Sequence, residues 1–211
     1  MVTQKFPLTY QELTELAGDQ LIRFSATFDE YWKLLEKAEF NADFYDNEII
    51  AMSYENELHS YIVTRLSFLL NTIFFTKTQD YKVHNSNRPI YVKDCGKHTV
   101  FNPDGSVIQQ PPVHFEYSPR VNAETTPSLI FEVLSKSTRA HDFGTKLPCY
   151  KQIPTLQTIV YLETTKPSLL LMERKSKNQW TETAYTELSD TITIDNQHIN
   201  IEDIYSGVTF E

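Results

Sequence analysis

A glutamate interrupts an almost wholly apolar run in the middle of the chain. The run predicts a central strand covered on both faces, and its sequence is Ser128-Leu129-Ile130-Phe131-Glu132-Val133-Leu134. An ionised carboxylate in such surroundings costs several kcal/mol of folding free energy unless another charge compensates it. A divalent cation shared with a second carboxylate would compensate it, and so would a Lys or Arg side chain. The sequence leaves both alternatives open for Glu132.

A second carboxylate with the right chemistry follows a proline, in Asn102-Pro103-Asp104-Gly105. Two carboxylates and several water molecules together hold a hard cation such as Mg²⁺ or Mn²⁺. The alternative is that Asp104 only shapes a turn, because Asn-Pro-Asp-Gly is a common turn sequence. Asp104 and Glu132 are therefore the candidate metal ligands.

A third group of polar residues follows the apolar run. Asp142, Lys146 and Tyr150 are spaced at i, i+4 and i+8, so on a helix they share one face. The alternative is an ordinary Asp-Lys pair on a solvated surface. Pro148 lies within the same segment, and because proline breaks a helix interior we expect the helix to restart near Gly144.

The N-terminal part carries two helix-start signals and a hairpin signal. Thr9 with Glu12, and Thr27 with Glu30, have the spacing of a capping box, so each pair predicts a helix that starts there. The second helix is predicted to run to about residue 38. A turn at Asp46-Asn47 then predicts a hairpin.

The elements that must position the candidate residues follow. Apolar residues at three- to four-residue spacing predict a long helix over about 56–75. Further elements are predicted as strands at 90–92, 99–101, 113–115, 128–134 and 158–162, a helix over 138–152, a closing hairpin over 169–172 and 180–185, and a small final element over 199–204.

Length and charge limit the function classes. With 211 residues the chain can bury a core without a disulfide or a structural metal, and we expect a single domain over residues 1–211. The net charge of −9 argues against a generic nucleic-acid-binding protein, whose surface is usually basic. It does not exclude a metal-dependent nuclease, because metal-binding carboxylates are themselves negative. Any basic surface must be local.

The cysteines and the N-terminus favour a cytoplasmic protein without a membrane segment. Cys95 and Cys149 are the only cysteines and do not make a disulfide framework. The first residues, Met-Val-Thr-Gln-Lys-Phe-Pro, lack the apolar core of a signal peptide. No run reaches the roughly 18 apolar residues of a membrane span.

Taken in order, the motifs resemble a bacterial family of restriction-endonuclease-like proteins in the PD-(D/E)xK superfamily, long labelled a domain of unknown function. The resemblance spans about Thr27 to Glu163. The residues that carry it are Asp46-Asn47-Glu48-Ile49-Ile50-Ala51-Met52, His59, Pro103-Asp104, Ile130-Phe131-Glu132-Val133-Leu134-Ser135-Lys136-Ser137-Thr138, Asp142, Lys146 and Tyr150.

The resemblance implies an α/β (α+β) fold with a restriction-endonuclease-like core: a central mixed β-sheet flanked by helices, an N-terminal helical layer and a C-terminal β-hairpin. It also implies Mg²⁺ or Mn²⁺ bound by Asp104 and Glu132. The superfamily has a catalytic lysine two residues after the strand acid, where this chain has Leu134. The resemblance implies that the family supplies this lysine from the following helix instead, which would be Lys146. Supporting residues would be Glu48, His59, Asp142 and Tyr150, and a basic rim for nucleic acid would be Lys136, Arg139 and Lys151. By themselves, His59 is a common hydrogen-bonded helix residue and Glu48 a hairpin residue that faces water.

The resulting hypothesis is a divalent-metal-dependent endonuclease that hydrolyses phosphodiester bonds in DNA. The alternative is a nuclease-like fold without activity that serves as a nucleic-acid or protein interaction module, which Leu134, Gly105 and the charge of −9 favour. A third hypothesis is hydrolysis of another phosphate ester at the same metal site. A homodimer is compatible with the composition.

Overall fold

The computed structural model describes residues 6–18, 20–52, 56–77, 79–118 and 121–210. Residues 1–5, on which part of the signal-peptide expectation rests, lie outside this range.

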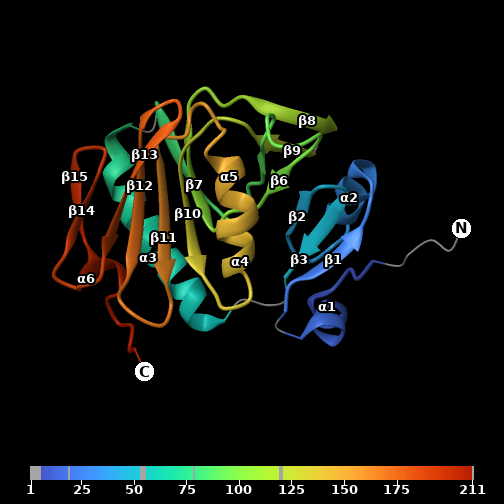
Figure 1. Ribbon diagram of the computed structural model, residues 1–211, viewed down its shortest axis with the longest axis horizontal. Coiled ribbons are helices and arrows are strands. Elements are labelled where there is room, and N and C mark those ends of the chain that lie inside the picture. Colours follow the sequence, from blue (N-terminus) through green and yellow to red (C-terminus); the bar gives the residue numbers. More distant parts are fainter. Residues whose placement is uncertain (1–5, 19, 53–55, 78, 119–120, 211) are drawn as a thin grey trace, which may run out of the picture.

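Three β-sheets with helices on their faces make up the described part (Figure 1). The helices are α1 (Tyr10–Ala17), α2 (Phe28–Leu35), α3 (Glu57–Phe74), the 3₁₀ turn η1 (Phe75–Lys77), α4 (Arg139–His141), the π-helical turn η2 (Asp142–Lys146), α5 (Leu147–Tyr150) and α6 (Ile201–Ile204). The strands are β1 (Ile22–Ser25), β2 (Ala42–Tyr45), β3 (Glu48–Ala51), β4 (Tyr81–Asn85), β5 (Ile90–Tyr91), β6 (Val100–Phe101), β7 (Gly105–Gln109), β8 (His114–Ser118), β9 (Val121–Glu124), β10 (Pro127–Leu134), β11 (Thr158–Glu163), β12 (Leu169–Ser176), β13 (Gln179–Tyr185), β14 (Thr191–Ile194) and β15 (Gln197–Asn200).

The N-terminal helices pack on a seven-stranded sheet of order β1-β3-β2-β6-β5-β9-β8. Both predicted capping boxes are present: Thr9 and Thr27 each accept a hydrogen bond from the backbone three residues on, and Glu12 and Glu30 bond back to the capping residues. The aromatic face of α2 is buried, with Trp32 at 0% exposure. The predicted hairpin at Asp46-Asn47 joins β2 to β3, and both turn residues have positive φ.

The six-stranded sheet, of order β13-β12-β11-β10-β7-β4, is the frame of the molecule. It is mixed, because β10 runs parallel to β11 while the other pairs are antiparallel. One face packs on α3 and on the C-terminal α6 and two-stranded sheet, and the other face packs on the helix formed by α4, η2 and α5 (Figure 1). As predicted, β10 is a central strand: Phe131 and Val133 are buried toward α3, and Ile130 and Leu134 toward α5. Alternation therefore turns Glu132 toward α5.

The sequence predicted that the helix after β10 restarts near Gly144, and this prediction is wrong. Arg139 to Tyr150 instead form a continuous helix that contains a π-helical turn, Asp142–Lys146. The Leu147 N–H donates to the Asp142 carbonyl, five residues back. This wider turn lets the helix continue to Pro148 without requiring the N–H that proline lacks.

The segment after Asp104 is a strand. The alternative of an Asn-Pro-Asp-Gly turn is not observed, because Gly105 begins β7 and pairs with both β4 and β10. A Cβ at Gly105 would lie 2.2 Å from the Phe131 ring, so a glycine is required by close packing. The sequence analysis took Gly105 as a feature that favours an inactive module, but close packing against Phe131 accounts for the glycine.

Cys95 and Cys149 form a disulfide that joins the β5–β6 connection to α5, with their Cα atoms 5.3 Å apart. The sequence did not predict this bond. Among the described helices none is long and apolar enough to cross a membrane.

Candidate functional site

Strand register brings the two candidate ligands together. In the β7–β10 pair Gly105 lies opposite Phe131, so Asp104 lies next to Glu132. The Asp104 N–H donates to Glu132 Oε2 at 3.2 Å, and the Val133 N–H donates to Asp104 Oδ2 at 2.6 Å. Both side chains are buried, at 8% and 2% exposure. The two carboxylates predicted from separate parts of the sequence therefore lie side by side.

His59 reaches Asp104 from the start of α3. Asn56 caps this helix by accepting a hydrogen bond from the His59 N–H at 2.8 Å, which fixes the first turn. The His59 ring places Nε2 3.1 Å from Asp104 Oδ2. The structure therefore brings His59, one of the predicted supporting residues, into contact with Asp104.

Lys146 is the centre of a buried ionic cluster. Its Nζ lies 3.1 Å from Glu132 Oε1, 3.2 Å from Asp142 Oδ1 and 3.6 Å from Asp43 Oδ2. The Tyr150 hydroxyl donates to Glu132 Oε1 at 2.7 Å. The alternative of a solvated Asp-Lys surface pair is wrong, because Asp142 and Lys146 are each only 2% exposed.

Leu134, which stands two residues after Glu132 where the superfamily has a lysine, is a core residue. It is 3% exposed and packs in the apolar cluster that also contains Tyr150. Lys146 reaches the strand acid from the neighbouring helix instead.

Asp43 and His141 belong to the same cluster, although neither was predicted from the sequence. Asp43, on β2, accepts from the Asn102 N–H at 2.7 Å and lies 2.9 Å from Nε2 of His141, on α4. Both side chains are buried, at 3% and 4% exposure. The resemblance implied a supporting acid on the β2–β3 hairpin, but it pointed to Glu48 instead of Asp43.

The electrostatics of the cluster follow from a surplus of buried negative charge. Burial raises the pKa of the Glu132 carboxyl well above its usual range, and Asp142 and Asp104 add to the rise while Lys146 opposes it. Burial also disfavours the Lys146 charge, but Asp43, Glu132 and Asp142 outweigh it and hold the lysine pKa well above its ordinary value. Lys146 is therefore a permanent cation, and Glu132 holds a proton more readily than an exposed glutamate.

The donor set fits a hard divalent cation. Four buried carboxylates, Asp43, Asp104, Glu132 and Asp142, act on Lys146, which is the one buried lysine among the described residues. A divalent cation would offset the remaining negative charge, and Mg²⁺ in proteins is held by one or two carboxylates with water as its other ligands. Within the described residues no cluster of three or more His, Cys, Asp or Glu side chains has ligand geometry. Asp104 and Glu132 are the pair that would hold the ion.

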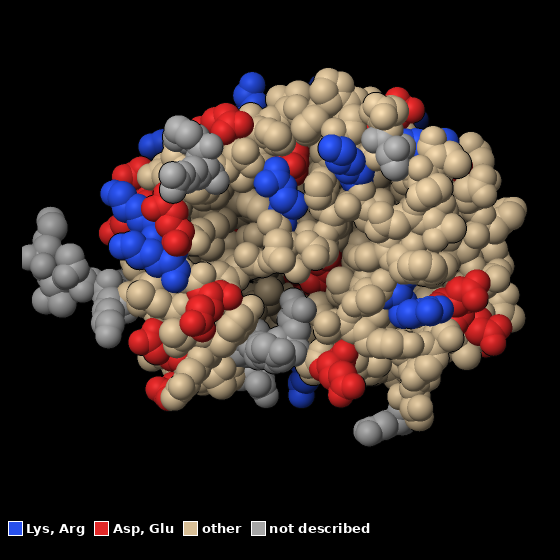
Figure 2. All heavy atoms as spheres, turned by 180° about the vertical axis from the view of Figure 1, so that it is seen from behind, with Lys and Arg blue, Asp and Glu red and all other residues tan. Residues whose placement is uncertain are grey.

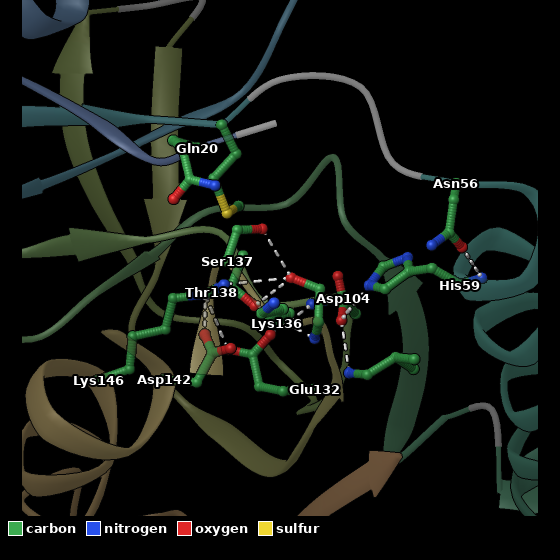
Figure 3. A pocket seen from close by; sticks show the side chains of 13 residues that line it. Gln20, Asn56, His59, Asp104, Glu132, Lys136, Ser137, Thr138, Asp142 and Lys146 are labelled. Atoms are coloured by element: carbon green, nitrogen blue, oxygen red, sulfur yellow. Dashed lines mark hydrogen bonds and ion pairs between the residues drawn. The ribbon is translucent and has the colours of Figure 1, made fainter. Parts of the chain in front are cut away.

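A pocket of about 500 Å³ opens onto this cluster (Figure 3). Asp104 lies in it between His59 on one side and the Glu132, Asp142 and Lys146 group on the other. Another part of its wall comes from the segment directly after β10, and the polar residues Ser135, Lys136, Ser137 and Thr138 line the pocket there. Lys136 is thus the predicted basic-rim residue that lies at the pocket.

Three other predicted residues lie away from the pocket lining. Glu48 is on the same face of the hairpin as Asp43 but at its turn end, where it pairs with Arg23 at 2.9 Å. Arg139 pairs with Glu163, and Lys151 pairs with Glu182 at 3.1 Å. The structure therefore does not bring Glu48, Arg139 or Lys151 to the carboxylates.

We expect Asp43 to contribute stability that depends on pH. Burial opposes its ionisation, but Lys146 and His141 outweigh burial and lower its pKa below the ordinary 3.8. A lowered pKa in the folded state gives stability that is present above pH 3.8 and is lost as the pH falls through the folded value. Urea unfolding should therefore show Asp43→Asn to be less stable than the parent at pH 7, with a difference that shrinks below pH 4. A difference that stayed constant down to pH 3 would contradict this, and Glu182→Gln on the surface serves as the control.

The chain is similar to several known proteins. A family model described as "Uma2: Putative restriction endonuclease" matches residues 28–202. The uncharacterised protein slr1290 of Synechocystis is 28% identical over 188 residues, covering 86% of this chain and 92% of that protein. A second uncharacterised Synechocystis protein, sll1609, is 30% identical over 139 residues, covering 65% of this chain and 74% of that protein.

The fold is shared with a solved structure from Anabaena variabilis that is described as a putative nuclease belonging to DUF820. The TM-score is 0.67 at 16% sequence identity, and the match covers 87% of this chain and 99% of the other. The predicted fold, a mixed sheet flanked by helices, is confirmed.

Proposed function

This chain belongs to the Uma2 family, in agreement with the resemblance, and from that premise we propose that it is an endonuclease that hydrolyses phosphodiester bonds in DNA with a bound Mg²⁺ or Mn²⁺. The observation that carries the proposal is the buried cluster in which four carboxylates act on one lysine at the base of an open pocket. Such an excess of negative charge is costly to bury unless a cation completes the site.

Five residues at the site have distinct roles in this proposal. Asp104 and Glu132 would hold the cation, which when bound lowers the pKa of a water molecule and neutralises charge on the scissile phosphate. His59 and Tyr150 keep the two carboxylates in orientation through the hydrogen bonds described above. Lys146, a permanent cation, opposes negative charge that develops on the phosphate.

The pocket wall supports the same assignment. Lys136 lies at the pocket with the hydroxyl groups of Ser137 and Thr138. An ammonium and hydroxyl groups bind phosphate oxygens without reading a base sequence. This wall would therefore position the phosphate beside the carboxylates.

The test is cleavage of supercoiled plasmid with Mn²⁺ or Mg²⁺, with and without a chelator. We expect nicked circles with either ion and none with the chelator. An absence of nicking across a range of both ions and protein concentrations would contradict the proposal.

The second candidate function is a binding module without activity. The observation that favours it is that Lys146 already pairs with Glu132 and Asp142 at 3.1 Å and 3.2 Å. Under this alternative the protein would bind DNA or a protein partner and leave plasmid intact with every ion.

A further inference from the structure

A second pocket, of about 630 Å³, lies beside the first. Met52, Asn56 and Asp104 line both, so the two are continuous at the candidate metal ligand. The second pocket runs between the start of β2, the first turns of α3 and the β4–β5 turn. On the face shown in Figure 2 the surface is hollowed near its middle, and acidic atoms are visible inside the hollow.

The two pockets differ in charge. Among the described residues that line the second pocket there is no Lys or Arg, whereas Asp43, Glu57 and Asp104 are acidic. Lys136 and Lys146 line only the first pocket. A phosphate would be repelled from the second pocket, whereas in the first pocket Lys136 and Lys146, together with the proposed cation, would offset its charge. The second pocket therefore suits an uncharged part of the substrate.

The ring of Tyr61 forms a fixed aromatic platform at the second pocket. Tyr61 is 42% exposed, so part of its ring is available for contact. Its hydroxyl donates to the Ser206 carbonyl at 2.8 Å, and Gly207 packs so closely that a Cβ there would lie 2.9 Å from the Tyr61 oxygen. The C-terminal segment thus holds the ring in place before any ligand binds. An aromatic ring fixed in advance is the feature on which a nucleobase stacks.

Two amide groups in the same pocket have hydrogen-bonding capacity to spare. Asn56 uses its oxygen to cap α3, and Asn87 uses its oxygen to accept from Asn41 at 3.2 Å. Within the described part of the chain the side-chain nitrogens of Asn56 and Asn87 make no hydrogen bond. With their oxygens engaged, both side chains present an N–H₂ donor, which pairs with acceptor atoms on the edge of a base.

We propose that the second pocket receives a nucleobase next to the scissile phosphate, so that the substrate is single-stranded or locally unpaired DNA. This inference rests on the proposed function, because it assumes that nucleic acid is the substrate. In a duplex the base is stacked and paired, and it reaches such a pocket only after it leaves the stack. The phosphate then lies on the side of Asp104 where Lys136 and Lys146 line the first pocket, and the base lies in the second pocket, whose described lining has no lysine or arginine.

The test is to measure binding of a single-stranded oligonucleotide that carries 2-aminopurine. Binding is monitored by the fluorescence of the 2-aminopurine, and a chelator is present so that no cleavage occurs. Replacing Tyr61 with Ala should weaken binding about tenfold or more, the loss that follows removal of one stacking ring. Tyr61→Phe keeps the ring and should bind as the parent does. Phe68→Ala is the matched control, because Phe68 is a 63% exposed aromatic residue on the same helix that does not line the pocket.

The outcomes separate this inference from the proposed function. If Tyr61→Ala and Phe68→Ala bind the oligonucleotide equally well, or if a matched duplex binds more tightly than the single strand, the base pocket is wrong. Plasmid cleavage that is independent of Tyr61 would overturn the pocket and leave the nuclease. Tyr61-dependent binding with no cleavage under any ion would overturn the nuclease and leave the pocket.

Discussion

Replacing Glu132 with Gln is expected to abolish metal-dependent cleavage while the protein stays folded. The substitution removes a charge and keeps the shape of the side chain. The single amide oxygen of Gln can accept from the Tyr150 hydroxyl or from the Asp104 N–H, which in the parent bind different carboxylate oxygens, so one of these two hydrogen bonds is lost. Burial already raises the pKa of Glu132, so a neutral side chain at this position is compatible with the fold. The rate of plasmid nicking should fall on the order of 10³-fold, the loss seen when a charge-stabilising group is removed from a reacting centre. Asp104→Asn should give a loss of the same size.

Glu124 offers a matched control for this experiment. It is also a glutamate of 2% exposure, but it pairs with Arg88 and His114 and does not line either pocket. Glu124→Gln should lose stability and keep its nicking activity at temperatures where it is folded. Equal activity in the parent and in Glu132→Gln would contradict the assignment.

Replacing Lys146 with Met is expected to destabilise the protein by about 3–5 kcal/mol, the cost of removing one partner from a buried ion pair. Asp43, Glu132 and Asp142 then remain without their common cation. The free energy of unfolding in urea measures the loss. Added Mn²⁺ should recover part of it, because a ligand that binds only the folded state stabilises that state.

Two further variants check the origin of this loss. Lys151→Met removes an exposed pair with Glu182 and should change stability by less than about 1 kcal/mol. In a Glu132→Gln background, Lys146→Met should cost less than it does in the parent, because one of the unpaired charges is gone. A Lys146→Met variant as stable as the parent would show that the lysine does not neutralise the cluster.

Local signals in the sequence predicted many of the elements. The capping boxes at Thr9 and Thr27 start helices since their hydrogen bonds form within one turn. The central strand around Glu132 was predictable because both of its faces are buried. Strands β1, β4, β7, β9 and β14 were not predicted. β14 pairs with the adjacent β15, but β1, β4 and β7 pair with partners that are distant in the sequence. Gly105 shows this best: it looks like a turn residue, but the Phe131 ring across the strand pair requires it.

The candidate site was predicted in part for the same reason. Glu132, Lys146 and Tyr150 were found since one lies in an apolar strand and the others share a helical face. Asp43 and His141 were missed because no local pattern connects residues that are 98 positions apart in sequence. The sequence alone also could not decide whether Asp43 or Glu48 is the hairpin acid at the site. That choice depends on the neighbouring strand β1, which supplies Arg23 as the partner of Glu48.

The central claim is that Asp104 and Glu132 together bind a divalent cation. Calorimetric titration of Mn²⁺ into the parent, Asp104→Asn and Glu132→Gln tests it most directly. We expect the parent to bind one ion and both variants to lose most of that affinity while their circular dichroism stays unchanged. Two folded variants that bind Mn²⁺ as tightly as the parent would contradict the claim.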